Sequence, residues 1–166
     1  MSETTLPLLN LAGRQRVQVA RLEAADRDAV VAMLGRCSAT TLQRRFHAVT
    51  DGVPYVTRLL ENVSGEIGFG AWLAGRCVGL ASLHAFNRTS AEMAVIVEDE
   101  WQQRGVGSAL VLALARQARK QRWRCLRADV HGDNHFIPVA LARMGRTRTS
   151  ISFGTYTVWV ELEEVA

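Results

Sequence analysis

The sequence has little lysine and cysteine and no long apolar run. The last two features argue against particular classes of protein. Lys120 is the only lysine, so the net charge of +4 is carried almost wholly by arginine. Cys37, Cys77 and Cys125 are odd in number and widely spaced, which argues against disulfides or a cysteine-based zinc site. No apolar run approaches the roughly 20 residues of a transmembrane helix, and no signal-peptide pattern opens the chain. We therefore expect a cytoplasmic protein with reduced thiols and no membrane partner.

Length and composition predict a single domain. The chain has 166 residues, of which 48% are hydrophobic, enough to fill one core. Residues 1–16 mix Ser, Thr, Pro and Gly without a period and are interpreted as an N-terminal arm, either loose or forming a short extra strand. Residues 17–166 contain no repeat, low-complexity tract or linker, so we expect one domain over this range.

A basic cluster lies where a long helix is expected to end and the next strand to begin. It consists of Arg116, Arg119, Lys120, Arg122, Arg124 and Arg127. Nucleic-acid binding is one interpretation of such a patch. The other is that cations complement the dipole at a helix C-terminus and stay solvated. No aromatic ladder or nucleic-acid motif accompanies the cluster, which favours a solvated patch and no nucleic-acid partner.

A short glycine-containing loop joins a predicted strand to a predicted helix. Ala91–Glu98 is an apolar run rich in strand formers, and from Val106 onwards apolar residues recur at helical spacing. Gly105 and Gly107 lie where this helix begins. A helix start has unpartnered amides and the positive end of the dipole, and glycine lets a phosphate approach the backbone. The pattern indicates a phosphate-binding loop, although two glycines are also consistent with a tight turn alone.

The segment Gln102-x-x-Gly105-x-Gly107 resembles the acetyl-CoA pyrophosphate loop of the GCN5-related N-acetyltransferase (GNAT) superfamily. The resemblance extends from about Val17 to Glu161. It implies an α/β fold of GNAT type, with a mixed, mostly antiparallel central sheet, helices on both faces and a bulged strand before the loop. It also implies that acetyl-CoA is the cosubstrate. The residues that it assigns to acetyl-CoA binding are Val95, Val97, Gln102, Gln103, Arg104, Gly105, Val106, Gly107, Ser108 and Asn134.

Periodicity and turn residues predict the other elements. Strands are expected over Val17–Leu22, Glu66–Ala74, Cys77–Phe86, Arg124–Val130, Thr147–Phe153 and Thr155–Glu161. Helices are expected over Ala24–Cys37, Ser38–Val49, Val53–Val63 and Asn134–Met144, and Ser38 is expected to cap the second of them. Tight turns make the middle strands an antiparallel meander, after which the glycine-loop helix crosses over to a parallel neighbour.

Glu92 is the candidate general base. Acetyl transfer needs a neutral amine, and deprotonating a lysine at neutral pH costs roughly 4–5 kcal/mol. In Ala91-Glu92-Met93 this glutamate is similar to the one in the "A-E-(I/V/F)" strand of GNAT lysine acetyltransferases, which implies that it accepts the proton directly or through water. Without the resemblance, the favoured interpretation of Glu92 is an ordinary carboxylate at a strand end that faces solvent.

Asn134 and Leu141 concern the leaving group. Asn134 matches the asparagine that opens the helix beside the pantetheine arm in this superfamily, and it is also a suitable N-cap. Seven residues later many relatives have a tyrosine that protonates the thiolate, where this chain has Leu141. Because a CoA thiolate is a tolerable leaving group, the missing acid weakens the prediction of an enzyme without defeating it. A catalytically weak acyl-CoA-binding sensor or structural protein is therefore one alternative.

The acceptor is inferred from Ser38-x-x-Thr41-x-x-Arg44-Arg45-Phe46. This segment resembles one in GNAT domains that acetylate lysines of bacterial acyl-CoA synthetases. Its residues are also consistent with a helix that has a core pair and solvated arginines. We predict a protein lysine as the acceptor, for example on an acyl-CoA synthetase, with a small-molecule amine as the alternative.

Two expectations concern charge at the site. Glu92, Glu98, Asp99 and Glu100 are expected to favour a cationic acceptor by placing negative charge along the strand Ala91–Glu98 and at its exit. His131 and His135 lie close to two aspartates, but Gly132-Asp133-Asn134 between them is a poor helix and no HExxH pattern occurs. We therefore predict no metal site.

Overall fold

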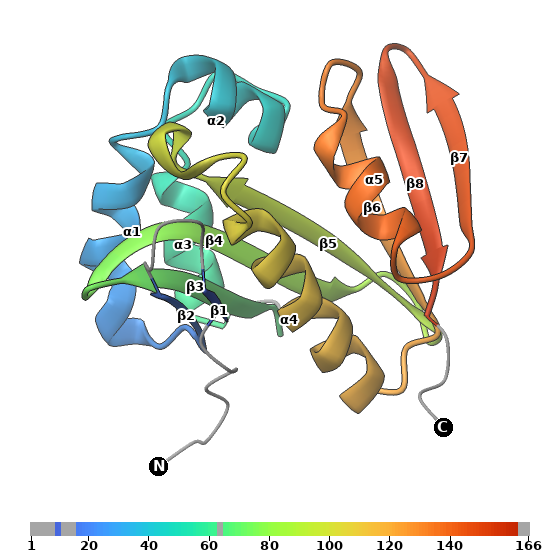
Figure 1. Ribbon diagram of the computed structural model, residues 1–166, viewed down its shortest axis with the longest axis horizontal. Coiled ribbons are helices and arrows are strands. Elements are labelled where there is room, and N and C mark those ends of the chain that lie inside the picture. The colour runs from blue at the N-terminus through green and yellow to red at the C-terminus, as the bar shows by residue number, and fades with distance from the viewer. Residues whose placement is uncertain (1–8, 11–15, 63–64, 163–166) are drawn as a thin grey trace.

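The computed structural model describes residues 9–10, 16–62 and 65–162, and their strands form one sheet between two layers of helices (Figure 1). The strands are β1 (Leu9–Asn10), β2 (Arg16–Arg21), β3 (Ile67–Leu73), β4 (Arg76–Ala85), β5 (Ser90–Val97), β6 (Cys125–His131), β7 (Thr147–Ser152) and β8 (Thr155–Glu161). The helices are α1 (Arg27–Leu34), α2 (Ala39–Phe46), α3 (Val53–Leu60), α4 (Val106–Lys120) and α5 (Phe136–Ala142), with short 3-10 helices η1 (Ala24–Asp26) and η2 (Asp99–Trp101).

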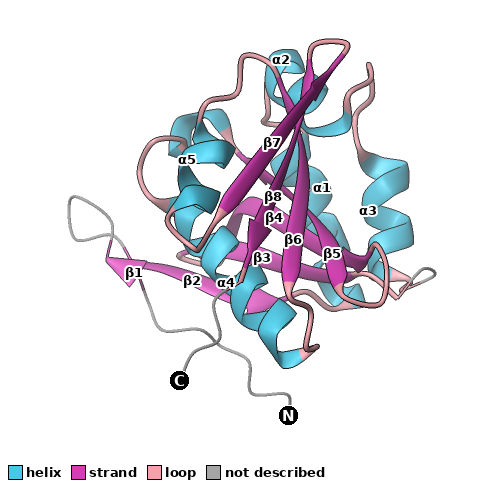
Figure 2. Ribbon diagram, turned by 90° about the vertical axis from the view of Figure 1, so that its right-hand side faces the viewer, coloured by secondary structure: helices cyan, strands magenta, loops and turns pink. Residues whose placement is uncertain are grey.

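The strands run in the order β1-β2-β3-β4-β5-β6-β8-β7, and the pair β5–β6 is parallel while the other described pairs are antiparallel. Helices α1 and α3 pack on one face through a core that includes Met33, Leu80 and Ile96. Helix α4 covers the other face, where Leu110 and Met93 belong to the larger core. Figure 2 shows the strands crossing between these layers. The predicted α/β GNAT-type fold is confirmed.

Several element boundaries differ from those predicted. The helix expected over Ala24–Cys37 is divided into η1 and α1, and α1 ends at Leu34 because Gly35 caps it. Helix α2 ends at Phe46 because His47 adopts a left-handed conformation with φ of 53°. In the predicted arm, β1 pairs with β2, and residues 1–8 and 11–15 lie outside the described part of the chain. Within the described residues, no helix is both long and apolar enough to cross a membrane.

The parallel pair β5–β6 is short. The two strands are in register only at Ser90↔Cys125, Ala91↔Leu126 and Glu92↔Arg127, and then they separate. Figure 1 shows β5 continuing beneath α2 while β6 turns away with β8. Beyond Glu92, the edge of β5 that faces β6 therefore has no strand beside it.

The β4–β5 ladder determines which groups lie on this free edge. Bonds from the Glu98 amide to the Val78 carbonyl (3.0 Å) and from Phe86 to Ser90 (3.0 Å) fix the phase of the antiparallel pattern. Bonded and non-bonded pairs alternate, so every second residue of β5 points its amide and carbonyl away from β4. Val95 and Val97 belong to this second set. The expected bulge is not in β5, whose register with β4 is continuous. A register shift occurs instead between Ala71 and Trp72 of β3.

Gly145 allows the chain after α5 to pass close to β8. A Cβ atom at Gly145 would lie 2.0 Å from the carbonyl oxygen of Glu161, a backbone atom that cannot move alone. We expect Gly145→Ala to destabilise the fold by about 1–3 kcal/mol, because overpacking forces the backbone to shift. In contrast, Gly35→Ala meets nothing closer than 3.5 Å and is the matched control. Urea unfolding of both variants measures the effect, and equal stabilities would contradict this account.

Candidate active site

A cavity of about 330 Å³ lies beside β5, between α2 and the start of α5. We call it the donor cavity. Of the residues predicted to bind acetyl-CoA, it is lined by Val95, Val97, Gln102, Gln103, Gly105, Gly107 and Asn134. The other three belong to the same loop and helix start but do not line the cavity. Arg104 lies over the Trp101 ring at 5.0 Å, Val106 is buried in the core, and Ser108 is exposed on the first turn of α4. The free edge of β5 and the glycine loop thus border one space.

Helix α4 begins at Val106, as predicted, and Gly105 precedes it as the N-cap with φ of 93°. This left-handed conformation explains the glycine at 105. Since a glycine N-cap has no side chain, another acceptor is needed for the amides of the first turn. Gly107 also lies close to α5. A Cβ atom at this position would lie 2.9 Å from the Phe136 ring, so that side chain would have to shift to admit any other residue.

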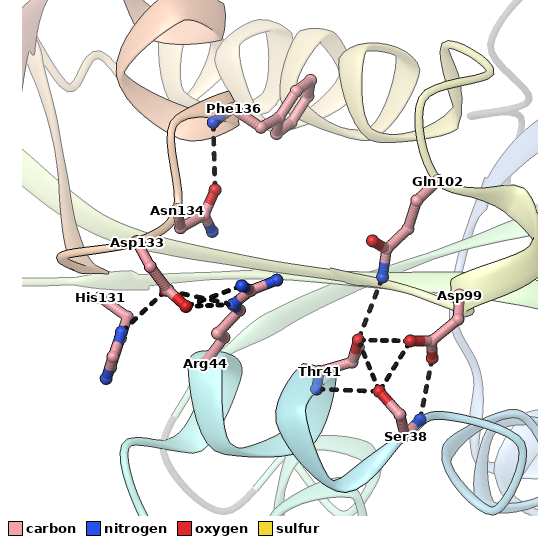
Figure 3. Close-up of polar contacts among 9 residues, drawn as sticks. All are labelled: Ser38, Thr41, Arg44, Asp99, Gln102, His131, Asp133, Asn134 and Phe136. Carbon is pink, nitrogen blue, oxygen red and sulfur yellow. Dashed lines mark hydrogen bonds and ion pairs between the residues drawn. The ribbon is translucent and has the colours of Figure 1, made fainter.

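Gln102 connects the loop to α2 (Figure 3). Its side-chain amide donates to the Val97 carbonyl (3.0 Å) and to Thr41 Oγ1 (3.1 Å). Thr41 Oγ1 donates to Asp99 (2.9 Å), and Asp99 also accepts from the Ser38 hydroxyl (2.7 Å) and amide (2.8 Å). Partial burial opposes ionisation of Asp99, but the hydrogen bonds from Ser38 and Thr41 outweigh it and lower the pKa of this carboxyl. These bonds hold the first turn of α2 against the loop.

Ser38 is also the predicted cap of α2. Its hydroxyl accepts a hydrogen bond from the Thr41 amide at 3.2 Å. Sequence reasoning predicted this cap but missed the hydrogen bonds from Ser38 and Thr41 to Asp99. The missing information was the partner, because Asp99 lies 61 residues away from Ser38 along the chain.

Arg44 reaches across the donor cavity to the opposite wall. Its guanidinium donates to both carboxylate oxygens of Asp133 at 2.7–3.1 Å (Figure 3). Hydrogen bonds from Arg44 and then from His131 lower the pKa of Asp133 to about 2. The neighbouring Asn134 accepts from the Phe136 amide at 3.1 Å, but the N-cap residue of α5 is His135, one residue after the predicted cap. Helix α2 is thereby connected to both sides of the opening.

A second cavity, of about 460 Å³, adjoins the first along β5. It lies between the C-terminal end of α2 and the N-terminal part of α3. We call it the acceptor cavity, since Glu92 and Ala94 line it. Arg45 lines both cavities. Its guanidinium lies 4.7 Å from the Phe46 ring centroid and 4.6 Å from that of Tyr55. The interpretation of Arg44 and Arg45 as merely solvated is therefore wrong, because both are held by specific contacts.

Glu92 is held by an arginine. Its side chain is 28% exposed, and Oε2 accepts from Arg127 Nη1 at 2.6 Å. Arg127 also donates to Asp129. Sequence reasoning assigned Arg127 to a solvated basic patch, and this assignment is wrong. The alternation within Cys125–His131 was the available signal, because it puts Arg127 and Asp129 on one face of a strand.

Two of the other acidic residues near β5, Glu98 and Asp99, do not line the acceptor cavity. The side chain of Glu98 is only 4% exposed and is paired with Arg36 at 3.0 Å and with Arg76. Asp99 is bound by Ser38 and Thr41, as described above. The expectation that this whole acidic group favours a cationic acceptor is therefore wrong for Glu98 and Asp99.

Neither a tyrosine in the expected place nor a metal cluster accompanies the site. Leu141 is fully buried in the core on α5 and does not line the donor cavity. Tyr55 lines the acceptor cavity, where its hydroxyl donates to Ser82 at 2.5 Å, and burial raises its pKa. The described residues include no group of three or more His, Cys, Asp or Glu side chains that could hold a metal ion.

Comparison with known proteins identifies the class. Residues 38–145 match the model of the acetyltransferase (GNAT) family, and the chain belongs to this family. It is an N-acetyltransferase with acetyl-CoA as cosubstrate. No curated sequence matches it.

Three solved structures illustrate the similarity of fold, although each shares less than a quarter of its sequence with this chain. The GNAT domain of S. lividans PAT is 22% identical, with a TM-score of 0.82 and coverage of 94% of this chain and 96% of that one. Ribosomal-protein-alanine N-acetyltransferase from Brucella melitensis is 21% identical (TM-score 0.67, coverage 87% and 99%). The PaiA N-acetyltransferase from Thermoplasma acidophilum, in complex with coenzyme A, is 13% identical (TM-score 0.68, coverage 87% and 98%). At these identities the likeness supports the fold.

Proposed function

We propose that the protein transfers the acetyl group of acetyl-CoA to the ε-amino group of a lysine on a partner protein, such as an acyl-CoA synthetase. The observation that carries this proposal is the arrangement of two adjoining cavities along β5. One borders the free backbone of Val95 and Val97, and the other contains Glu92. We place the reaction in the cytoplasm, since Cys37, Cys77 and Cys125 are free thiols, which suits a reducing compartment.

The donor cavity suits the parts of acetyl-CoA in order. The amides of Val95 and Val97 would pair with the pantetheine amides as a strand would. The first turn of α4 would receive the pyrophosphate, because a helix N-terminus attracts anions. Asn134 would lie beside the pantetheine arm. The acetyl group would then point along β5 towards the acceptor cavity.

In the reaction, the lysine nitrogen attacks the carbonyl carbon of the thioester, and the carbon–sulfur bond breaks. Before the attack, the ammonium group loses one proton to Glu92, directly or through water, and the nitrogen loses its second proton to water as the tetrahedral adduct collapses to the amide. CoA leaves as the thiolate, which needs no acid because an ordinary thiol has a pKa of about 8.5. Burial of Leu141 in the core is compatible with this step.

A protein acceptor is supported by two fully exposed apolar side chains, of which Val49 lies beside the acceptor cavity. Val49 is 99% exposed and lies between Ala48 and Thr50, both of which line the cavity. Phe153 is fully exposed in the β7–β8 turn, next to Gly154, whose carbonyl accepts from the Gly132 amide at 3.1 Å. Such side chains add contact area for a protein. The Brucella melitensis neighbour is named for a ribosomal-protein alanine, so the α-amino group of a protein is the second candidate.

Acetyl-CoA binding can be tested at Val95, whose amide points away from β4. Proline at this position removes that donor without breaking the β4 ladder, because the ladder uses the amides of Ala94 and Ile96. We expect Val95→Pro to weaken acetyl-CoA binding about three- to tenfold, the effect of one neutral hydrogen bond. Calorimetry measures the affinity. Ala94→Pro is the matched control and should destabilise the fold. A folded Val95→Pro variant with unchanged affinity would show that the pantetheine lies elsewhere.

The role of Glu92 predicts a separation of binding from turnover. Glu92→Gln should bind acetyl-CoA normally while turnover falls by roughly 10²–10⁴, the usual contribution of a general base. Glu100→Gln is the control, because its carboxylate is 60% exposed and lies beyond the other end of β5. We expect the control to keep wild-type turnover. Full activity of Glu92→Gln would mean that the amine loses its proton elsewhere.

The acceptor class is tested with two substrates, a purified acyl-CoA synthetase and Nα-acetyl-lysine methylamide. We expect Val49→Asp to lower kcat/KM for the protein about tenfold, since it puts a charge in a protein contact, and to leave the small amine unaffected. Val139→Asp on α5, where Val139 is 56% exposed, is the control and should change neither. Efficient acetylation of polyamines without acetylation of any folded protein would refute a protein acceptor. No acetylation at all would favour an acyl-CoA-binding sensor.

A further inference from the structure

Arg127 on β6 bridges two carboxylates of the acceptor cavity. Nη1 donates to Glu92 Oε2 at 2.6 Å, and Nη2 donates to Asp129 Oδ2 at 2.8 Å and Oδ1 at 3.0 Å. Glu92 is the register partner of Arg127 across the short parallel pair, while Asp129 is two residues further along the same strand. One guanidinium thereby fixes the separation of the two carboxylates.

The bridge is held in place by residues of β8 and of the turn between β4 and β5. The Arg127 guanidinium lies 4.6 Å from the Phe86 ring centroid and 5.7 Å from that of Trp159, and these two rings pack edge to face. Thr157, the cross-strand partner of Asp129, donates its hydroxyl to Asp129 Oδ1 at 2.7 Å. A planar guanidinium that stacks on rings and donates from both ends cannot be reproduced by lysine.

The bridge leaves uncompensated negative charge on one wall of the cavity. Glu92 and Asp129 carry two negative charges, and Arg127 neutralises one of them. Both carboxylates line the cavity, and their side chains are 28% and 32% exposed, so each can still meet a ligand. Arg45 and Arg58 line the same cavity and contribute positive charge. A cationic group would therefore be drawn to the wall formed by β5 and β6.

We propose that Asp129 holds the ammonium group of the incoming lysine, and that Arg127 positions Asp129 and Glu92 for this purpose. This inference rests on the proposed function. It divides the work between the two carboxylates: Asp129 binds the charged amine before reaction, and Glu92 accepts its proton. Glu92 takes the first proton before the nitrogen attacks the thioester carbonyl carbon, the second proton leaves to water as the carbon–sulfur bond breaks, and Asp129 takes part in neither transfer.

The competing explanation is that the three charged side chains only fasten β6 to β5 where the strands begin to separate. In that case Asp129→Asn lowers the melting temperature but leaves the KM for the amine unchanged. The two explanations thus differ in a kinetic readout that a purely structural contact does not affect. Asparagine has nearly the same shape as aspartate and can still accept from Arg127 and Thr157.

The test measures steady-state kinetics with Nα-acetyl-lysine methylamide and acetyl-CoA as the varied substrates. We expect Asp129→Asn to raise the KM for the amine about tenfold or more, the loss of one charge-assisted contact, with kcat within about threefold of wild type and the KM for acetyl-CoA unchanged. Glu92→Gln should show the opposite division, a lower kcat. Arg127→Met should show both defects, and Arg127→Lys should not restore either, because lysine lacks the fork.

Thr157→Val provides a second variant that leaves every charge in place. It removes only the hydroxyl that orients Asp129, and we expect the KM for the amine to rise about two- to fivefold, since one neutral donor is lost. Wild-type turnover combined with an unchanged amine KM in both Asp129→Asn and Thr157→Val would overturn this inference and leave the proposed function intact. Absence of turnover with any amine in the wild type would overturn the proposed function, and this inference with it.

Discussion

Strands β5 and β6 are in register only from Ser90 to Glu92, and a strand that loses its neighbour exposes amides and carbonyls that need other partners. In this protein the Gln102 side chain donates a hydrogen bond to the Val97 carbonyl, and the remaining edge borders the donor cavity. The same separation puts Glu92 at the last paired position, where Arg127 on β6 can still reach it. Both halves of the site therefore depend on where the pairing stops. A longer β5–β6 ladder would close the donor cavity.

Features determined by neighbouring residues could be predicted from the sequence. The strand before the glycine loop and the helix start after it follow from apolar spacing and from Gly105, and the structure has both. Ser38 was identified as a helix cap because capping needs only residues two or three positions away, and the cap predicted at Asn134 lies one residue before the N-cap of α5. The order of the middle strands followed from short turns. Boundaries were less accurate, since the left-handed His47 that ends α2 has no marker in its residue type.

Features that depend on distant residues could not be predicted. Arg127 belonged to a run of basic residues, and only the register of β5 with β6 shows that it meets Glu92. Glu98 looked like a surface charge, yet Arg36 and Arg76 let it be buried, because a buried carboxylate needs such partners. The contact of Gly107 with Phe136 of α5 was not foreseen from the glycine loop. In each case the local pattern was correct and the missing fact was the partner.

Helix α2 has only eight residues, too few for a helix that is stable by itself. Its position is set by Asp99 and Gln102 at one end and by the Arg44–Asp133 ion pair that reaches over the donor cavity. Arg45, which follows Arg44, forms part of the acceptor cavity. Two adjacent residues of one helix therefore line the two cavities, and a rigid-body shift of α2 would alter both cavities together. By thermodynamic linkage, a donor that shifts α2 changes the affinity for the acceptor, and the acceptor changes the affinity for the donor by the same factor.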